Sequence, residues 1–410
     1  MVIGRRICLA GCVVAALIGL SACGGASGDG SSSGPIKVGM IVAKTGPYAS
    51  SNVPFLDGVQ TAVDHANANG AIGGRKLDLV VEDEKSDPKV GVIAYQKLVK
   101  REKVVGLVGS LDSSDLQVAL LPRLESDKVP SVGSFSTTKK ALKPFNKYFF
   151  ALQPSYADQA DVAIASQIKA TGKPNARVAS IILPITSGYE WESLVKERVA
   201  KAGGTYAGTV PIDPTATDAD AQIQKIIKAK PDFIALHGSP TTAVVLLKSM
   251  AKFSYKVPVV GIYAVGPRST YESVPTEYGS LLHYVSAFTP HGVPAAGRDE
   301  LEQAAKASGH ADEVADANFV NGWVAGRTLV AGLRNAGKEV SRESLVQGLE
   351  RLRQFDTGGL SPTVSFAPDR RAGIQVNRPY GFDYTKKAFV AVGRYDDYQD
   401  AISNEYLPTP

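Results

Sequence analysis

A loop rich in serine and aspartate holds the first residues of this sequence that could do chemistry. Residues 106–115 read GLVGSLDSSD, in which an apolar run and a glycine are followed by three serines and two aspartates within six positions. The run predicts a buried strand, and the residues after it predict the start of a helix. Hydroxyl and N–H groups at such a junction can hold an anion, because a helix N-terminus carries unpaired donors and a partial positive charge. Alternatively, Ser113 or Ser114 only caps the helix.

A serine could also act as a nucleophile, but the sequence lacks the partners that catalysis needs. It contains no H-E-x-x-H pattern, no G-x-x-x-x-G-K-[ST] phosphate loop and no G-x-G-x-x-G after a predicted strand. Residues 30–34 (GSSSG) match the G-x-S-x-G nucleophile pattern, yet no strand precedes them. The histidines are scattered through the chain: His65, His237, His283, His291 and His310. We predict a protein that is not an enzyme and that uses no cofactor or metal.

Composition and charge favour an ordinary globular protein. The chain has 410 residues, of which 44% are hydrophobic and 21% are charged, and this is enough material for a core. The length predicts two domains. A formal net charge of +5 is close to neutral for this length, and no basic stripe with interleaved aromatic residues is present. Nucleic acid is therefore not expected as a partner.

The first 35 residues have the layout of an export segment. Arg5 and Arg6 precede an apolar stretch from Ile7 to Leu20, and small residues follow it. This stretch is short for a membrane span, which needs about 20 apolar residues. The pattern predicts a secretory signal peptide over residues 1–22.

The end of this segment, LSAC at positions 20–23, resembles the lipobox of bacterial lipoproteins. The resemblance implies that Cys23 is lipidated with several acyl chains, which stable anchoring requires. Residues 23–35 are rich in glycine and serine and predict a flexible tether. The other cysteines, Cys8 and Cys12, lie within the signal, so the body is expected to contain no disulfide. We expect a protein outside the cytoplasm, lipid-anchored to the cell membrane in the periplasm or on the outer face.

From residue 36 onward, short apolar runs alternate with helical patterns, which predicts parallel sheets with right-handed crossovers. In the first half, strands are expected at 36–43, 76–81, 104–109, 129–135 and 147–152, with helices at about 53–69, after Pro88 and at about 114–125. The alternation restarts near Pro154. Strands are then expected at 176–184, 205–212, 232–238 and 257–263, with helices at 189–204, about 218–228 and 241–253.

The last part of the chain breaks this alternation. Helices are expected at about 299–307, 316–336 and 341–353, and antiparallel strands follow with turns at Asp369 and Tyr384. These late helices cannot complete a second half that is already a closed alternation. We therefore expect the chain to cross back to the first lobe and then to return to the second.

Several segments together resemble the leucine/isoleucine/valine-binding proteins of ABC transporters, which are type I periplasmic solute-binding proteins. They are TGPYA (45–49), NANGAIGGRKL (67–77), VEDEKSDP (81–88), the serine loop and GLSPTVSFAPDR (359–370). The resemblance implies an α/β fold of two Rossmann-like lobes joined by a three-stranded hinge, with crossovers near 153–156, 285–290 and 358–364. Lobe 1 is expected at 36–154 and 286–360, and lobe 2 at 155–285 and 361–410.

The same resemblance implies a function and a mechanism. We expect an extracytoplasmic solute-binding lipoprotein that captures a small carboxylate-bearing solute, such as an amino acid or a related compound, and delivers it to the permease of an ABC importer. The ligand would bind lobe 1 and select the closed arrangement of the two lobes. An aromatic acid or another non-amino-acid ligand, or a role as a ligand sensor, remains open.

The resemblance places the carboxylate site on two loops of lobe 1. Ser114 falls on the family's ligand serine, and Ser113 beside it is the alternative. The loop GSFSTT contributes the backbone of Phe135 and the side chain of Thr137, with Ser136 between them. All of these groups are uncharged donors, which form strong charge-assisted hydrogen bonds with a carboxylate. Tyr48, in the TGPYA loop, is expected at the carboxyl end of a strand, where ligands of such sheets bind.

Lobe 2 departs from the amino-acid-binding pattern. Ser187 and the glycine after it occupy the positions of the family's tyrosine–glycine pair, and Tyr189 follows them. Tyr263 occupies the position of the family's acidic residue, which pairs with the ligand's ammonium group. A buried ammonium without a carboxylate partner is costly. Tyr263 could replace the acid in part by a cation–π contact, or it could suit an aromatic or uncharged tail. His237, at another strand end, either lines this wall or is an ordinary surface histidine.

Overall fold

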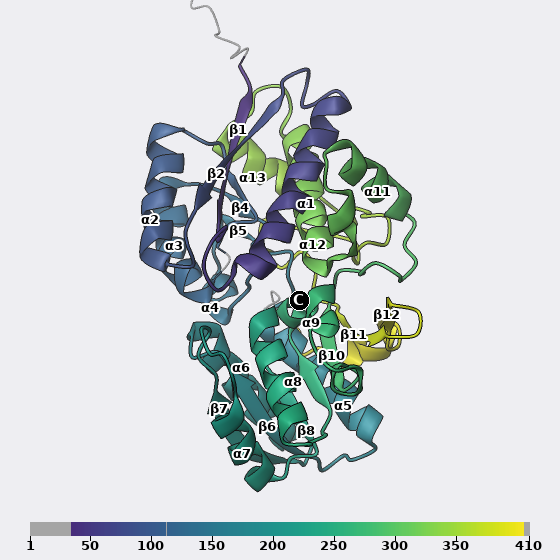
Figure 1. Ribbon diagram of the computed structural model, residues 1–410. Coiled ribbons are helices and arrows are strands. Elements are labelled where there is room, and N and C mark those ends of the chain that lie inside the picture. Colours follow the sequence, from purple (N-terminus) through teal and green to yellow (C-terminus); the bar gives the residue numbers. More distant parts are fainter. Residues whose placement is uncertain (1–33, 112, 406–410) are drawn as a thin grey trace, which may run out of the picture. The chain divides into compact units, whose positions relative to one another are not determined.

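The computed structural model describes residues 34–111 and 113–405, which form two β-sheets with helices packed on them (Figure 1). The predicted signal peptide, Cys23 and nearly all of the predicted tether lie outside the described residues. The α/β fold of two lobes is as expected. Among the described residues, no helix has both the length and the apolar character that a membrane crossing would require.

The first lobe contains a five-stranded parallel sheet with the strand order β2-β1-β3-β4-β5. Its strands are β1 (Ile36–Val42), β2 (Leu77–Asp83), β3 (Leu107–Val108), β4 (Ser131–Val132) and β5 (Phe149–Phe150). The helices between them are α1 (Ala49–Ala68), α2 (Pro88–Gln96) with the π-helical turn η1 (Lys97–Arg101), α3 (Ser114–Asp127) and α4 (Lys139–Leu142). The buried strand residues are almost all aliphatic or aromatic, as parallel strands covered on both faces require.

Helices from late in the chain complete this lobe, as Figure 1 shows for α12 beside α1. They are α11 (Arg298–Ala307), α12 (Ala317–Ala336) and α13 (Arg342–Glu350), with the short turn η3 (Ala311–Ala315) before α12. Glycines allow α1 and α12 to approach closely. A Cβ atom on Gly58 would lie 2.1 Å from the Phe319 carbonyl oxygen, and one on Gly322 would lie 2.0 Å from the Phe55 carbonyl oxygen.

The second lobe contains a seven-stranded sheet with the order β12-β11-β10-β9-β8-β6-β7. Its strands are β6 (Arg177–Ile182), β7 (Thr205–Pro211), β8 (Phe233–Leu236), β9 (Val259–Gly261), β10 (Leu282–Ser286), β11 (Arg378–Asp383) and β12 (Ala388–Ala391). Its helices are α5 (Tyr156–Thr171), α6 (Thr186–Lys201), α7 (Asp220–Ala229), α8 (Pro240–Lys252), α9 (Arg268–Glu272) and α10 (Thr276–Gly279), with the 3₁₀ turns η2 (Tyr263–Val265) and η4 (Asp396–Ala401). The last two strands pair antiparallel, so the chain does return to this sheet at its end.

The segments that connect the two sheets run side by side. Ala151, after β5, forms a parallel bridge with Ala372. Thr289, after β10, donates its backbone N–H to the Leu360 carbonyl at 2.8 Å. These contacts join the three connections, while the exact lobe boundaries given above stay a prediction.

Candidate ligand-binding site

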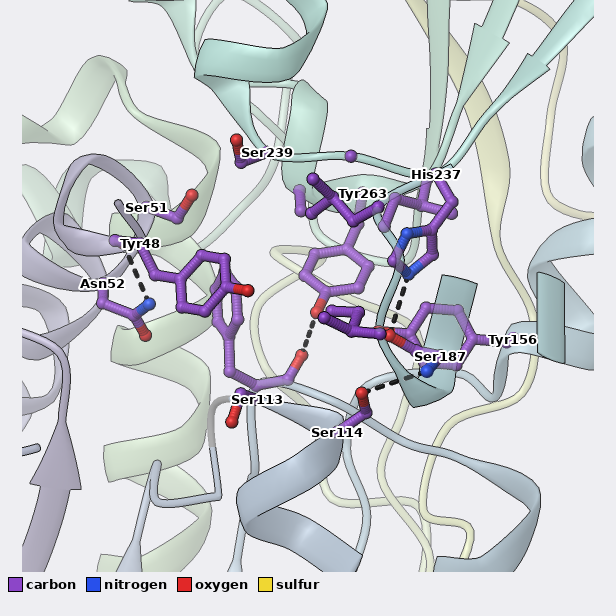
Figure 2. Close-up of a pocket in the computed structure, with 16 residues that line it drawn as sticks. Tyr48, Ser51, Asn52, Ser113, Ser114, Tyr156, Ser187, His237, Ser239 and Tyr263 are labelled. Atoms are coloured by element: carbon purple, nitrogen blue, oxygen red, sulfur yellow. Dashed lines mark hydrogen bonds between the residues drawn. The ribbon is translucent and has the colours of Figure 1, made fainter. Parts of the chain in front are cut away.

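A cavity lies where the loops of the two sheets meet, and it encloses about 450 Å³ that no protein atom fills, part of it open to solvent (Figure 2). Its walls come from the carboxyl ends of strands in both lobes, where open α/β sheets bind ligands. Lobe 1 contributes Tyr48, Ser51, Asn52, Ser113, Ser114 and Phe135. Lobe 2 contributes Tyr156, Leu183, Ile185, Ser187, His237, Gly238, Ser239, Ile262, Tyr263 and Ala264.

The serine loop caps its helix, as one of the two predictions had it, and both of its serines at that point line the cavity. Ser113 is the N-cap of α3, and its Oγ accepts a hydrogen bond from the Leu116 backbone N–H at 3.2 Å. Ser114, the first residue of the helix, is buried and its Oγ accepts from the Ser187 backbone N–H of lobe 2 at 3.0 Å (Figure 2). Both hydroxyls act as acceptors in these bonds, so their protons can still be donated into the cavity.

A network of buried polar side chains extends from Ser187 on the side of lobe 2. The Ser187 hydroxyl lies 2.9 Å from His237 Nε2 (Figure 2). His237 is only 2% exposed, and burial lowers its pKa from 6.5 to about 3, so the ring is neutral at physiological pH. The Tyr156 hydroxyl lies 3.1 Å from Ser136 Oγ, and burial raises the pKa of this tyrosine above its ordinary value. The hydroxyl groups and the imidazole ring of this network are therefore uncharged.

Tyr263 bridges the two lobes. Its hydroxyl donates a hydrogen bond to the Phe135 carbonyl oxygen of lobe 1. Its ring meets the Phe135 ring edge to face, with centroids 5.1 Å apart, and Phe135 meets Phe55 in the same way at 5.1 Å. The backbone N–H of Tyr263 donates to Gln159 Oε1 at 3.3 Å. These contacts give the cavity an aromatic wall that is fixed from both lobes.

Among the residues that the structure describes (34–111 and 113–405), none that lines the cavity carries a formal charge. None of the residues that line it is Asp, Glu, Lys or Arg, and the one histidine is neutral. Within the described part of the chain, no group of three or more His, Cys, Asp or Glu side chains is arranged to hold a metal. The arrangement can therefore hold a small ligand through hydroxyl donors, helix N-terminal N–H groups and apolar contacts.

Seven of the ten predicted site residues line the cavity: Tyr48, Ser113, Ser114, Phe135, Ser187, His237 and Tyr263. Three do not. The side chain of Ser136 is used by Tyr156, and Thr137 is buried, with no hydrogen-bond partner for its Oγ1 among the residues that the structure describes. Tyr189 is 56% exposed and lies outside the cavity. The prediction that these three contact a ligand receives no support from their position.

Sequence reasoning missed other lining residues, among them Ser51, Asn52, Tyr156 and Ser239. Ser51 and Asn52 belong to the first turn of α1, which begins at Ala49 rather than near Val53. Ser239 is the N-cap of α8, in a capping box with Thr242. That S-P-T-T pattern after a strand was a readable signal for a polar strand end.

Comparison with known proteins gives a consistent picture. A family model described as periplasmic binding protein matches residues 35–379. The Leu/Ile/Val-binding protein BraC3 of Rhizobium johnstonii is 23% identical over 324 residues, which cover 78% of this chain and 85% of that protein.

Two solved structures share the fold. The fatty acid ABC transporter substrate-binding protein from Thermomonospora curvata superposes with a TM-score of 0.80 at 21% identity, covering 92% of this chain and 95% of that one. A branched chain amino acid ABC transporter protein from Thermus thermophilus with bound valine gives a TM-score of 0.80 at 18% identity, covering 88% and 96%. At these identities the likeness shows the fold alone.

Proposed function

We propose that this chain, which belongs to the periplasmic binding protein family, captures a small carboxylate-bearing solute between its lobes and delivers it to a permease. Members of this family bind substrates for ABC transporters and are not enzymes. The observation that carries this proposal is the cavity between the strand ends of both lobes, whose described lining residues include neutral donors and no charged side chain. Closure of lobe 2 over a ligand held by lobe 1 would present the loaded shape to the transporter.

The carboxylate is expected at the start of α3. Ser113 and Ser114 can each donate a hydroxyl proton there, and the first N–H groups of a helix of 14 residues add donors and a favourable dipole. Hydrogen bonds from neutral donors to a carboxylate are about twice as strong as those between neutral groups. An anion is thus stabilised in this cavity without a cationic partner.

The rest of the ligand is expected to be uncharged. An ammonium group would find no carboxylate among the lining residues that the structure describes, and without one its burial would be costly. The wall around Tyr263 and Ile262 instead suits an aliphatic or aromatic tail. The similar proteins include both a fatty acid binder and branched-chain amino acid binders. The absence of an acid among the described lining residues favours the first kind of ligand, a carboxylate without an ammonium group.

Leucine, two analogues of it and one aromatic acid test this proposal in a thermal-shift assay. Isocaproate is leucine without its amino group, and isoamylamine is leucine without its carboxylate. We expect isocaproate to raise the melting temperature in proportion to its affinity, phenylacetate to report on an aromatic tail, and isoamylamine to have no effect. Stabilisation by leucine but not by isocaproate, or by isoamylamine at all, would refute the proposal.

The lipid anchor is a separate part of the proposal. We propose that Cys23 is lipidated and holds the protein on the extracytoplasmic side of the membrane, on the strength of the lipobox-like LSAC at positions 20–23. Membrane fractionation tests this directly. Wild type is expected with the membranes in a processed form, and Cys23→Ala is expected either in the soluble fraction or as the unprocessed precursor. A processed Cys23→Ala protein that fractionates with the membranes as wild type does would refute the anchor.

A further inference from the structure

Two helices that start where the lobes meet have no capping side chain of their own. Helix α6 of lobe 2 begins at Thr186, and its N-cap residue Ile185 makes no side-chain cap hydrogen bond. Helix α4 of lobe 1 begins at Lys139, and its N-cap residue Thr138 makes none either. The first N–H groups of a helix have no acceptor within the helix, so both helices need acceptors from elsewhere.

Each lobe supplies this acceptor to the other. Asp115, in α3 of lobe 1, accepts through Oδ1 from the Thr186 N–H at 3.2 Å and from the Thr186 hydroxyl at 2.6 Å. Glu190, in α6 of lobe 2, accepts from the Lys139 N–H with its two carboxylate oxygens at 2.9 and 3.1 Å. A negative charge is also what the positive end of a helix favours.

Neither carboxylate lines the cavity, so these contacts form beside the site and not within it. Separation of the lobes would break both pairs and leave the N–H groups and carboxylates to water. We propose that Asp115 and Glu190 are reciprocal interlobe caps, which set the equilibrium between open and closed lobes and thereby tune ligand affinity without contacting the ligand. The link to affinity rests on the proposed function, whereas the coupling between the lobes does not.

The size of the effect follows from what a helix cap contributes. Replacing a capping carboxylate by alanine removes an acceptor that exists only in the closed arrangement, so affinity for isocaproate should fall by about 2- to 30-fold per cap. Asp115→Asn and Glu190→Gln are matched controls, because each retains an oxygen that can accept the same hydrogen bond.

Glu190 adds a readout that a merely structural residue would not give. Burial raises its pKa from 4.5 to about 7, and the charged and titratable groups that face it are Lys139, Lys140, Glu405 and Tyr156. To the extent that closure causes this burial, closure takes up a proton, so closure is favoured below pH 7 and weakened as pH rises through 7. The protonated acid still offers its carbonyl oxygen to Lys139. Closure should therefore be about tenfold more favourable at pH 6 than at pH 8, and Glu190→Gln should remove this difference.

Amide-resolved hydrogen exchange of the ligand-free full-length protein tests the coupling. The protection factors of interest are those of Thr186 and Lys139, the two capped amides on opposite lobes. Asp115→Ala is expected to lower protection at Thr186 and also at Lys139, which Asp115 does not touch. Glu190→Ala is expected to lower protection at Lys139 and also at Thr186, whose N–H Asp115 caps. Loss of protection only at the amide next to the substitution would overturn the proposal.

If an alanine variant does not fold, the amide variants Asp115→Asn and Glu190→Gln still test the proposal. Glu190→Gln should retain protection at both amides and should abolish the pH dependence of protection at Thr186, and a pH dependence equal to that of wild type would overturn the proposal. Failure of isocaproate to bind would count against the proposed function but would leave these ligand-free measurements valid. The two proposals can therefore fail separately.

Discussion

The hydroxyl of Tyr263 offers the sharpest single test of how the cavity closes. Tyr263→Phe removes one oxygen atom and leaves the ring, so the edge-to-face contact with Phe135 at 5.1 Å can persist. The loss includes the hydrogen bond to the Phe135 carbonyl oxygen, which crosses from one lobe to the other. Phe135 and Tyr263 are both buried, at 4% and 4% exposure, so no water replaces the bond in the closed arrangement.

The expected magnitude follows from that burial. A buried acceptor left without its partner costs about 1–3 kcal/mol. In an open arrangement water can reach the carbonyl, so the cost falls on closure and not on folding. A change of 1.4 kcal/mol is tenfold in affinity, so the dissociation constant for isocaproate should rise by about 5- to 150-fold. The melting temperature of the ligand-free protein should change little.

Isothermal titration calorimetry of wild type and Tyr263→Phe with isocaproate measures this effect. Tyr189→Phe is the matched control, because that tyrosine is 56% exposed and lies outside the cavity, and its affinity should equal that of wild type. An unchanged dissociation constant in Tyr263→Phe, with isocaproate binding tightly, would refute the reasoning. It would mean that the bound protein does not use the bridge seen here.

Three further substitutions probe the site, the packing and the pH response. Ser114→Ala removes the acceptor of the Ser187 N–H and a donor to the carboxylate, so affinity should fall at least about tenfold with little change in melting temperature; an equal loss of stability would show a structural role. Gly322→Ala places a Cβ 2.0 Å from the Phe55 carbonyl and should cost about 1–3 kcal/mol in urea unfolding, whereas Gly34→Ala, which meets nothing within 4 Å, should be neutral. The pKa of His237 is about 3 when folded and 6.5 when exposed, so the stability it contributes is present above pH 6.5 and is lost as pH falls toward 3. Wild type should therefore lose about 2 kcal/mol more than His237→Asn between pH 7 and pH 5, and equal losses would contradict a buried neutral ring.

Sequence reasoning located most elements because their apolar periodicity is strong. The helix predicted at about 299–307 is Arg298–Ala307, and the strand predicted at 205–212 is Thr205–Pro211. The start of α1 was placed about four residues late, since Pro54 lies inside the helix, where proline is usually disfavoured. For this reason Ser51 and Asn52, which lie in the additional first turn of α1 and line the cavity, were not predicted as site residues.

The position of Tyr189 outside the cavity has a geometric cause. Ser187 and Tyr189 both lie within α6, two positions apart. At 3.6 residues per turn, two positions correspond to a rotation of about 200°, so when Ser187 points into the cavity Tyr189 points away from it. Contacts between the lobes, such as the one from Tyr263 to Phe135, join residues far apart in the chain, and no local pattern predicts them.

The close packing of α12 on α1 has a consequence for how the protein acquires its structure. The two glycine-mediated contacts join residues near the start of the body to residues near its end, and strands β11 and β12 of the other sheet come later still. A chain that emerged from a narrow export channel with its N-terminus first would hold two unfinished sheets, each with an unprotected apolar face, until almost all of it had passed. Such long-range closure slows folding and exposes aggregation-prone surface. If the chain is exported in this way, as proposed, we expect it to depend on chaperones during export, and we expect a version truncated before Ala317 to be degraded.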